Sequence, residues 1–335
     1  MEYRILGKTG LRVSRMGFGG LPIQRANEED CRKILLHLSE LGVNYIDTAR
    51  AYTVSEGYIG KAIAGMRDRF VIASKSMARD KESMARDIEL SLRNLQTDYI
   101  DLYQVHNPNP AAFETVIGPG GALEALLEAK KAGKIGHIGF TSHTADMFRR
   151  ALQEDWVETV MFPYNIVETQ GEELIRTCRE KNIGFLVMKP LAGGAIEDVR
   201  LALRYIAQNE NVDVILPGMD SPAQVQENYD AINDPAPLTE NEQAKIACIR
   251  KELGTNFCRR CNYCAPCTVG INISQVFLDD SYMTRYGLPD WAKAKYAGQA
   301  KHASDCIDCG ACESRCPYEL PIRKMLKSVA ERFGY

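Results

Sequence analysis

Residues 42–52, GVNYIDTARAY, show the pattern that decides the fold: a short apolar run that ends in polar side chains. Its centre, residues 44–48, predicts a buried strand with Asp47 near its end. Amphipathic stretches such as 28–42 and 86–96 predict helices between runs of this kind. The other runs lie at 16–20, 70–75, 99–106, 135–142, 157–163, 184–190 and 212–218.

Strand–helix units at intervals of about 20–40 residues predict an α/β fold, a (β/α)8 TIM barrel formed by residues 1–235. The alternative is an open, doubly wound sheet, which would show a G-x-G-x-x-G turn after its first strand. The stretch Gly17-Phe18-Gly19-Gly20 is too short for that turn. Residues 3–16 predict a hairpin that turns between Gly7 and Gly10 and plugs the bottom of the barrel.

The composition is that of an ordinary globular protein of 335 residues, with 45% hydrophobic and 25% charged side chains. A net charge of −3 is too balanced for a polyanion-binding surface, so we expect no nucleic-acid partner. The sequence has no apolar run long enough to span a bilayer, and residues 1–14 lack the apolar core of a secretory signal. We therefore expect no membrane association and a cytoplasmic location.

Eight of the eleven cysteines fall in two runs near the C-terminal end of the chain. In a reducing compartment such thiols are metal ligands more often than disulfides. A cysteine at every third position lets three thiolates bind one iron–sulfur cubane while the fourth reaches a second cluster. The runs are Cys258-x2-Cys261-x2-Cys264-x2-Cys267 and Cys306-x2-Cys309-x2-Cys312-x3-Cys316.

This spacing predicts two [4Fe–4S] clusters whose ligands are shared between the runs. The alternatives are a pair of structural zinc sites or a redox-labile patch of thiols. Zinc knuckles usually pair two C-x2-C units and do not run four ligands in one string. The predicted ligand sets are Cys258, Cys261, Cys264 and Cys316 for one cluster, and Cys306, Cys309, Cys312 and Cys267 for the other.

Residues 236–335 are predicted to form a linker helix and a mainly helical iron–sulfur domain. A proline-rich boundary at 234–237 precedes Thr239-x-x-Glu242, which caps a helix. Further helices are predicted at 274–287, 289–298 and 321–334. This part resembles the helical ferredoxin domains that are fused to oxidoreductases. In those domains a proline usually follows the fourth cysteine of each run, and Thr268 replaces the first of these prolines.

Polar side chains stand at the ends of three predicted strands: Asp47, Lys75 and His106, with Tyr52 on the loop after Asp47. The C-terminal strand ends of a (β/α)8 barrel face its active site. Each side chain alone has an ordinary explanation, as a helix cap, a solvated lysine, a loop residue or a packing ring. The four together predict a catalytic site.

Residues 1–235 resemble the aldo-keto reductases, because GVNYIDTARAY, SEGYIGKAI, VIASKS and SLRNLQTDYIDLYQVHNP occur in that family's order. The resemblance implies an oxidoreductase that interconverts a small-molecule carbonyl and an alcohol with a catalytic tetrad of Tyr52, Lys75, Asp47 and His106. Tyr52 would supply the proton, Lys75 would lower the pKa of its phenol from the ordinary value near 10, and Asp47 would orient Lys75. His106 would hydrogen-bond the carbonyl oxygen.

The resemblance also implies a site for NAD(P)H. Gly19 and Gly20 match the family's first-strand turn beside the cofactor. Thr141 and Ser142 match a Ser-Asn pair that binds the carboxamide, and Met188 stands where an aromatic ring commonly stacks on the nicotinamide.

At the adenosine end of that site, Glu227 and Asn228 match the family's motif. Gly218 and Gln224 stand where NADPH-preferring members often place lysine and arginine, and Met161 replaces a usual glutamine. We therefore expect little preference for NADPH.

Two functional hypotheses follow from the sequence. In the first, the barrel is a catalytic oxidoreductase and the clusters transfer electrons or shape the pocket. A hydride carries two electrons and a cubane passes one, so direct exchange between them needs an intermediary such as a flavin. The clusters could instead serve an external ferredoxin or another redox protein. In the second hypothesis, the chain is an electron-transfer or partner-binding protein whose barrel has lost nicotinamide-dependent activity.

Overall fold

The computed structural model describes residues 1–254 and 256–335 and divides into two compact units. The barrel unit comprises Met1–Asn165, Thr169–Pro190 and Asp198–Pro237. The cysteine unit comprises Leu238–Tyr335 together with two short segments, Ile166–Glu168 and Leu191–Glu197.

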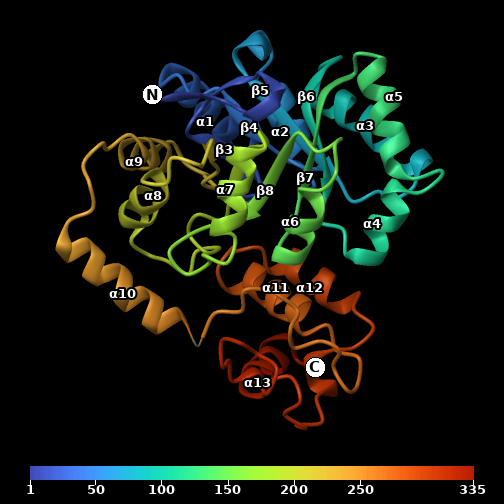
Figure 1. Ribbon diagram of the computed structural model, residues 1–335, viewed down its shortest axis with the longest axis vertical. Helices are drawn as coiled ribbons and strands as arrows, with labels where there is room; N and C mark the ends of the chain where they lie inside the picture. The colour runs from blue at the N-terminus through green and yellow to red at the C-terminus, as the bar shows by residue number, and fades with distance from the viewer. Residues whose placement is uncertain (255) are drawn as a thin grey trace. The chain divides into compact units, whose positions relative to one another are not determined.

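Eight parallel strands form the centre of the barrel unit (Figure 1), in the order β10-β9-β8-β7-β6-β5-β4-β3. Isolated bridges from Met16 to Ile215 and from Gly19 to Gly218 join the two edge strands and close the ring. The predicted (β/α)8 barrel is therefore confirmed. The strands are β3 (Gly17–Gly19), β4 (Tyr45–Asp47), β5 (Val71–Ser76), β6 (Ile100–His106), β7 (Ile135–Thr141), β8 (Thr159–Pro163), β9 (Gly184–Met188) and β10 (Val214–Ile215).

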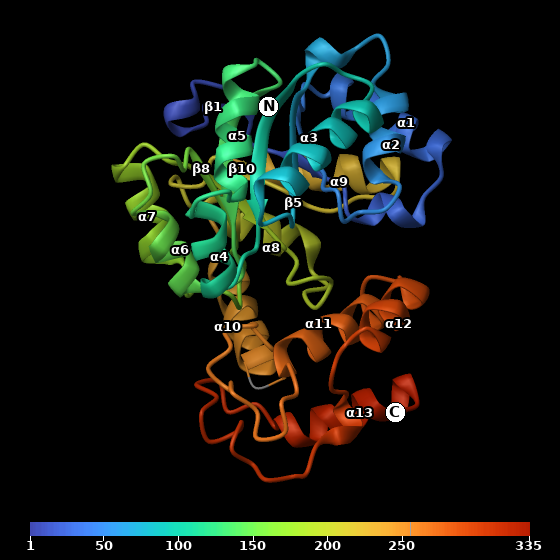
Figure 2. The same cartoon turned by 90° about the vertical axis from the view of Figure 1, so that its right-hand side faces the viewer.

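The helices of this unit lie outside the strands, as two perpendicular views show (Figure 1, Figure 2). The last of them, α9, packs against both α8 and α1, which completes the outer ring. The helices are α1 (Glu28–Glu40), α2 (Ser55–Ala62), α3 (Lys81–Leu95), α4 (Pro110–Ile117), α5 (Ala122–Lys131), α6 (Ala145–Ala151), α7 (Glu172–Glu180), α8 (Val199–Ala207) and α9 (Pro222–Ile232), with short 3-10 turns at Gly7–Thr9, Pro22–Arg25 and Arg67–Arg69.

Most elements are a few residues shorter or longer than their predicted ranges, and two of the differences have a clear local reason. Helix α3 begins five residues before the predicted Arg86, because the side chain of Asp80 accepts a hydrogen bond from the Ser83 N–H at 2.8 Å and caps the helix there. Strand β10 has two residues because Pro217 has no N–H to continue the ladder.

The N-terminal hairpin pairs β1 (Tyr3–Ile5) with β2 (Arg12–Ser14) and turns between Gly7 and Gly10, as predicted. Leu6 and Val13 are fully buried in a cluster with side chains from β4, β5, β6, β8, β9 and β10. The N–H of Lys8 donates to the Asn182 carbonyl at 2.6 Å, just before β9 begins. The hairpin therefore covers the N-terminal end of the barrel.

Gly7→Ala is expected to destabilise the barrel by about 1–3 kcal/mol more than the matched change Gly10→Ala. Both glycines have positive φ, 50° and 72°, so alanine strains both positions. A Cβ on Gly7 would also lie 2.2 Å from the Gly184 nitrogen, whereas a Cβ on Gly10 meets nothing within 4 Å. Denaturant unfolding of both variants measures the difference, and equal losses would contradict this account of the hairpin.

The cysteine unit is helical, with an apolar core from three of its helices. Val276 and Phe277 of α11, Tyr296 of α12 and Leu326 and Val329 of α13 are buried together. The capping box predicted at Thr239 and Glu242 is present at the start of α10. The helices are α10 (Glu240–Gly254), α11 (Ile273–Thr284), α12 (Pro289–Ala297) and α13 (Ile322–Phe333), with a 3-10 turn at Ala303–Asp305. Across the described residues, every helix is too short or too polar to cross a bilayer.

Candidate active site and cysteine clusters

The side chains of Asp47 and Lys75 form a buried ion pair at the C-terminal ends of β4 and β5. Lys75 Nζ lies 2.6 Å from Asp47 Oδ2 and donates a second hydrogen bond to the Thr48 carbonyl at 2.9 Å. The side chain of Lys75 is 2% exposed and that of Asp47 is 6% exposed. Parallel neighbours bring their strand ends to the same edge of the barrel, which explains why residues 28 positions apart in the chain meet here.

Tyr52 and His106 lie beside this pair. Lys75 Nζ is 4.7 Å from the centre of the Tyr52 ring, and the rings of Tyr52 and His106 meet edge to face with their centres 6.3 Å apart. The structure thus brings together all four residues of the predicted tetrad. The residues that follow the two rings, Thr53 and Asn107, have positive φ values of 41° and 46°. Non-glycine residues adopt this conformation uncommonly, which is typical of positions where the surrounding structure holds a side chain in place.

Burial and charge act in opposite directions on the ion pair. Burial lowers the pKa of Lys75, and the negative charge of Asp47 opposes that effect. Burial likewise raises the pKa of Asp47, against the opposing influence of Lys75 and of a hydrogen bond from Gln104. Burial is the larger influence on both groups, so the pKa of Lys75 lies below its ordinary value and that of Asp47 above its own.

Gln104 belongs to this site and was not predicted from the sequence. Its Nε2 donates to Asp47 Oδ1 at 3.3 Å, opposite the bond from Lys75. The available signal was its place two residues before His106 on one strand, since alternate residues of a strand share a face.

Glu56 is the second missed residue, a carboxylate that is 1% exposed. The hydroxyls of Ser74 and Ser91 each donate to it at 2.7 Å, Asn94 donates at 3.1 Å, and Arg50 forms an ion pair with it. This network joins α2 and α3 to β5, and the charge of Glu56 favours the ammonium form of Lys75.

The glycines predicted to lie beside a cofactor stand where backbones approach closely. A Cβ on Gly19 would lie 2.9 Å from the Pro217 oxygen, on Gly20 2.7 Å from the Asp47 oxygen, and on Gly218 2.6 Å from the Pro22 side chain. These contacts bring the ends of β3, β4 and β10 together, so the glycines have a packing role in the barrel itself.

Polar groups also gather at the ends of β7 and β8. Thr141 and Ser142 are buried, and Thr141 Oγ1 accepts a hydrogen bond from the Asn107 N–H at 3.0 Å, next to His106. Asn165 is fully buried, and its Nδ2 donates to the Lys189 carbonyl at 2.9 Å. Asn165 was not predicted from the sequence. This donor and acceptor set is of the kind that a carboxamide requires.

The two methionines of the predicted cofactor site both belong to the barrel's apolar interior. Met161, on β8, is 1% exposed. Met188, at the end of β9, is half-buried and packs against the same cluster. Met161 therefore serves in packing inside the barrel, and Met188 adds apolar surface at the end of β9.

The predicted adenosine-end residues lie on α9, where Glu227 is exposed and Asn228 is buried. Gln224 Oε1 accepts a hydrogen bond from the Asp220 N–H at 2.8 Å. Asp220 in turn forms an ion pair with Arg25 at 2.6 Å. Arg25 is thus already engaged by a carboxylate two residues before α9 begins.

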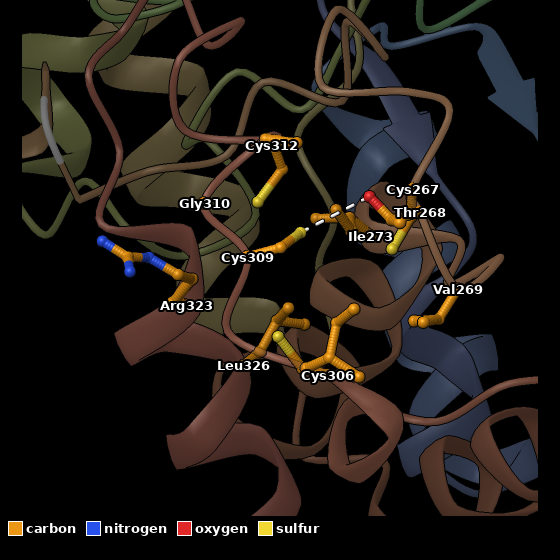
Figure 3. A pocket seen from close by; sticks show the side chains of 12 residues that line it. Cys267, Thr268, Val269, Ile273, Cys306, Cys309, Gly310, Cys312, Arg323 and Leu326 are labelled. Atoms are coloured by element: carbon orange, nitrogen blue, oxygen red, sulfur yellow. Dashed lines mark hydrogen bonds between the residues drawn. The ribbon is translucent and has the colours of Figure 1, made fainter.

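The eight clustered cysteines surround two separate cavities in the cysteine unit. Each set combines three residues of one run with one of the other, as the spacing predicts, and both cavities have otherwise mainly apolar walls. Figure 3 shows the cavity that Cys267 and the cysteines of the second run line. The sets are Cys258, Cys261, Cys264 and Cys316 around one cavity, and Cys267, Cys306, Cys309 and Cys312 around the other.

Within residues 1–254 and 256–335, no three Cys, His, Asp or Glu side chains converge closely enough to hold a single metal ion. A [4Fe–4S] cluster makes a different demand, because it takes four thiolates that stand apart around one cubane. Four cysteines around each apolar cavity fit that demand. Burial raises the pKa of Cys264 to about 12, so metal binding there must displace a proton.

Two arginines flank the first cysteine set. Arg260, between Cys258 and Cys261, forms a buried ion pair with Glu168 at 2.6 Å. Arg259 is also buried, donates to the Val167 carbonyl at 3.0 Å and stacks on the Tyr318 ring at 3.8 Å.

The second set has a polar contact of its own. Thr268 Oγ1 lies 3.4 Å from Cys309 Sγ, and this contact lowers the pKa of the Cys309 thiol.

Comparison with protein-family models matches residues 15–200 to the "Aldo/keto reductase family" and residues 257–321 to the "4Fe-4S dicluster domain". Among curated proteins, the chain is 26% identical over 286 residues to L-galactose dehydrogenase of Arabidopsis thaliana, covering 70% of this chain and 89% of the relative. It is 30% identical over 222 residues to NADH-specific methylglyoxal reductase of Escherichia coli K12, covering 57% of this chain and 68% of the relative.

Among solved structures, an aldo-keto reductase from Bacillus halodurans in its holo form superposes with a TM-score of 0.64 and 28% identity. The match covers 74% of this chain and 96% of that one.

Proposed function

We propose that this chain, which belongs to the aldo/keto reductase family, interconverts a small carbonyl compound and its alcohol in the barrel and holds two [4Fe–4S] clusters in the cysteine unit. The observation that carries the first half is the contact of Tyr52 with a buried Lys75–Asp47 pair and with His106. The second half is supported by the two four-cysteine cavities.

In the proposed mechanism Tyr52 moves the proton. When a carbonyl is reduced, negative charge develops on its oxygen, and the Tyr52 hydroxyl donates a proton to it. The Lys75 ammonium stabilises the phenolate that remains, and Asp47 and Gln104 fix the position of Lys75. His106 orients the carbonyl oxygen by a hydrogen bond. Oxidation of an alcohol uses the same groups in reverse.

A bound nicotinamide would supply or accept the hydride. The residues that suit it are the buried polar groups of Thr141, Ser142 and Asn165 for the carboxamide and the side chain of Met188 beside the ring. Asn228, Gln224 and Glu227 would line the adenosine end. The fit rests on the chemistry of these donors and on their place at the strand ends.

The clusters would be held by the two mixed sets, with Cys316 and Cys267 as the ligands exchanged between runs. Each cluster would pass one electron at a time to a redox protein such as an external ferredoxin. Exchange with a two-electron hydride donor needs an intermediary, and a flavin would serve.

The experiment is anaerobic purification with analysis of iron, sulfide, zinc and flavin, followed by assays of small aldehydes, ketones and alcohols with NADH and NADPH. Iron and sulfide together with nicotinamide-dependent turnover would support both halves. Stoichiometric zinc without sulfide would refute the cluster proposal. Clusters without turnover across the substrate panel would favour the electron-transfer alternative.

We predict that the chain shows little preference for NADPH over NADH, less than about a hundredfold. Gly218 and Gln224 carry no positive charge for a 2′-phosphate, and Asp220 engages Arg25. The relative named as an NADH-specific reductase supports this expectation. Calorimetric titration with both cofactors measures the ratio, and a preference for NADPH above about a hundredfold (~2.7 kcal/mol) would refute it.

The variant Gln224→Arg provides a gain-of-binding control for that prediction. It introduces a cation at a position where NADPH-preferring members often carry one. The variant should therefore raise the affinity for NADPH while leaving that for NADH almost unchanged.

A further inference from the structure

Thr268 is the residue that directly follows Cys267, and its hydroxyl points to a cysteine of the other run. Figure 3 shows the contact as a dashed line from Thr268 to Cys309, at 3.4 Å between Oγ1 and Sγ. Both cysteines line the same cavity. A thiolate ligand cannot donate a hydrogen bond, so with a cluster bound the hydroxyl must be the donor.

The backbone around Thr268 is held by hydrogen bonds that do not involve its side chain. The Gly270 N–H donates to the Cys267 carbonyl at 3.0 Å, and Arg315 donates to the Pro266 carbonyl at 2.7 Å. These contacts hold the backbone at Thr268 in place whatever rotamer its side chain adopts. A small substitution at 268 can therefore remove the hydroxyl and leave the loop in place.

The equivalent position in the second run carries no hydroxyl. Cys316 is followed by Pro317, which lines the other cavity. Proline cannot donate through its side chain or through its backbone nitrogen. The position after the fourth cysteine therefore carries a hydroxyl that contacts a ligand sulfur in the first run and no donor in the second.

We propose that Thr268 tunes the reduction potential of the cluster held by Cys267, Cys306, Cys309 and Cys312. The inference rests on the proposed binding of clusters in these cavities. Reduction adds one electron to the cluster, with no bond formed or broken, and makes the ligand sulfurs more negative. A hydrogen bond from Thr268 stabilises the reduced state more than the oxidised one and so raises the potential.

The size of the effect is set by the exposure of the contact. Thr268 and Cys309 are both exposed, so water competes for the sulfur. A net hydrogen bond of ordinary strength changes an equilibrium by about threefold to tenfold. Tenfold corresponds to ~59 mV for a one-electron couple.

The test is an EPR-monitored redox titration of the anaerobically purified, cluster-loaded chain and of three variants. Thr268→Val keeps the branched shape and loses the hydroxyl, Thr268→Ala loses both, and Thr268→Ser keeps the hydroxyl. We expect the Val and Ala variants to lower the reduction potential of one cluster. At a fixed applied potential, the reduced-to-oxidised ratio of that cluster should fall by about threefold to tenfold. The Ser variant should keep the potential of the unmodified chain, and the potential of the other cluster should not change in any of the variants. The signal that Cys309→Ser alters identifies the affected cluster.

The proposal would be overturned by a Ser variant whose potential shifts as far as that of the Val variant, or by an equal shift of both clusters. A change below about twofold in the reduced-to-oxidised ratio would overturn it as well. Failure of both Val and Ala to assemble the cluster would overturn it too, because it would assign Thr268 a structural role. Iron and sulfide analysis of the unmodified chain tests the binding of clusters separately from the tuning of their potential by Thr268. Clusters without a Thr268 effect refute the tuning alone, whereas absence of iron and sulfide refutes the proposed function.

Discussion

Tyr52→Phe is expected to lower turnover by about 10² to 10⁴, the range for losing general acid–base catalysis. Phenylalanine keeps the ring and its contacts with Lys75 and His106, so the change removes only the hydroxyl that donates the proton. The affinity for the nicotinamide should change little, because the hydroxyl acts on the substrate oxygen. Steady-state kinetics with the best carbonyl or alcohol substrate, together with cofactor titration, measures both quantities.

Tyr58→Phe provides a matched control for this experiment. Tyr58 is half-buried like Tyr52 but lies on α2, six positions along the chain, and we give it no chemical role. Its variant should keep normal turnover. A Tyr52→Phe protein that retains more than about half its rate, with chemistry shown to limit that rate, would mean that Tyr52 serves only in packing.

The barrel was predictable because its signals are local. Each strand is a short apolar run, and parallel neighbours in a closed sheet must bring their ends to one rim. That rule brings Asp47, Lys75 and His106 together without any knowledge of side-chain geometry. Tyr52 is different, since it stands on a loop, and the signal for it was its place five residues after Asp47.

The residues that were missed depend on contacts between distant segments of the chain, and among them only Gln104 had a local signal, its place two residues before His106. Gln104 reaches Asp47 from 57 positions away, and Glu56 gathers its donors from β5 and α3. Asn165 follows β8 in a segment that carries no periodic signal. The contact between Thr268 and Cys309 spans 41 positions and depends on how the two cysteine runs fold against each other. Spacing predicted the sets of cysteines, whereas it could not predict the polar groups around them.

Loss of a single cluster ligand is expected to have the second large effect. The unmodified chain, purified without oxygen, should contain about eight irons and eight sulfides. Cys261→Ser should lower both numbers toward four, because serine is a poor substitute for a thiolate ligand. The free cysteine Cys248 supplies the control, since it is exposed on α10 and lines neither cavity. Cys248→Ser should therefore keep its full iron and sulfide content.

The crosswise ligand sets make a sharper prediction than the iron content alone. If each run held its own cluster, Cys316→Ser would damage the cluster of Cys306, Cys309 and Cys312. The structure instead groups Cys316 with Cys258, Cys261 and Cys264 around one cavity. Cys316→Ser should therefore alter the same EPR signal as Cys261→Ser, although 55 positions separate the two residues. Cys267→Ser should alter the other signal, together with Cys309→Ser. Pairing of the effects by run would refute the shared ligand sets while leaving the presence of two clusters intact.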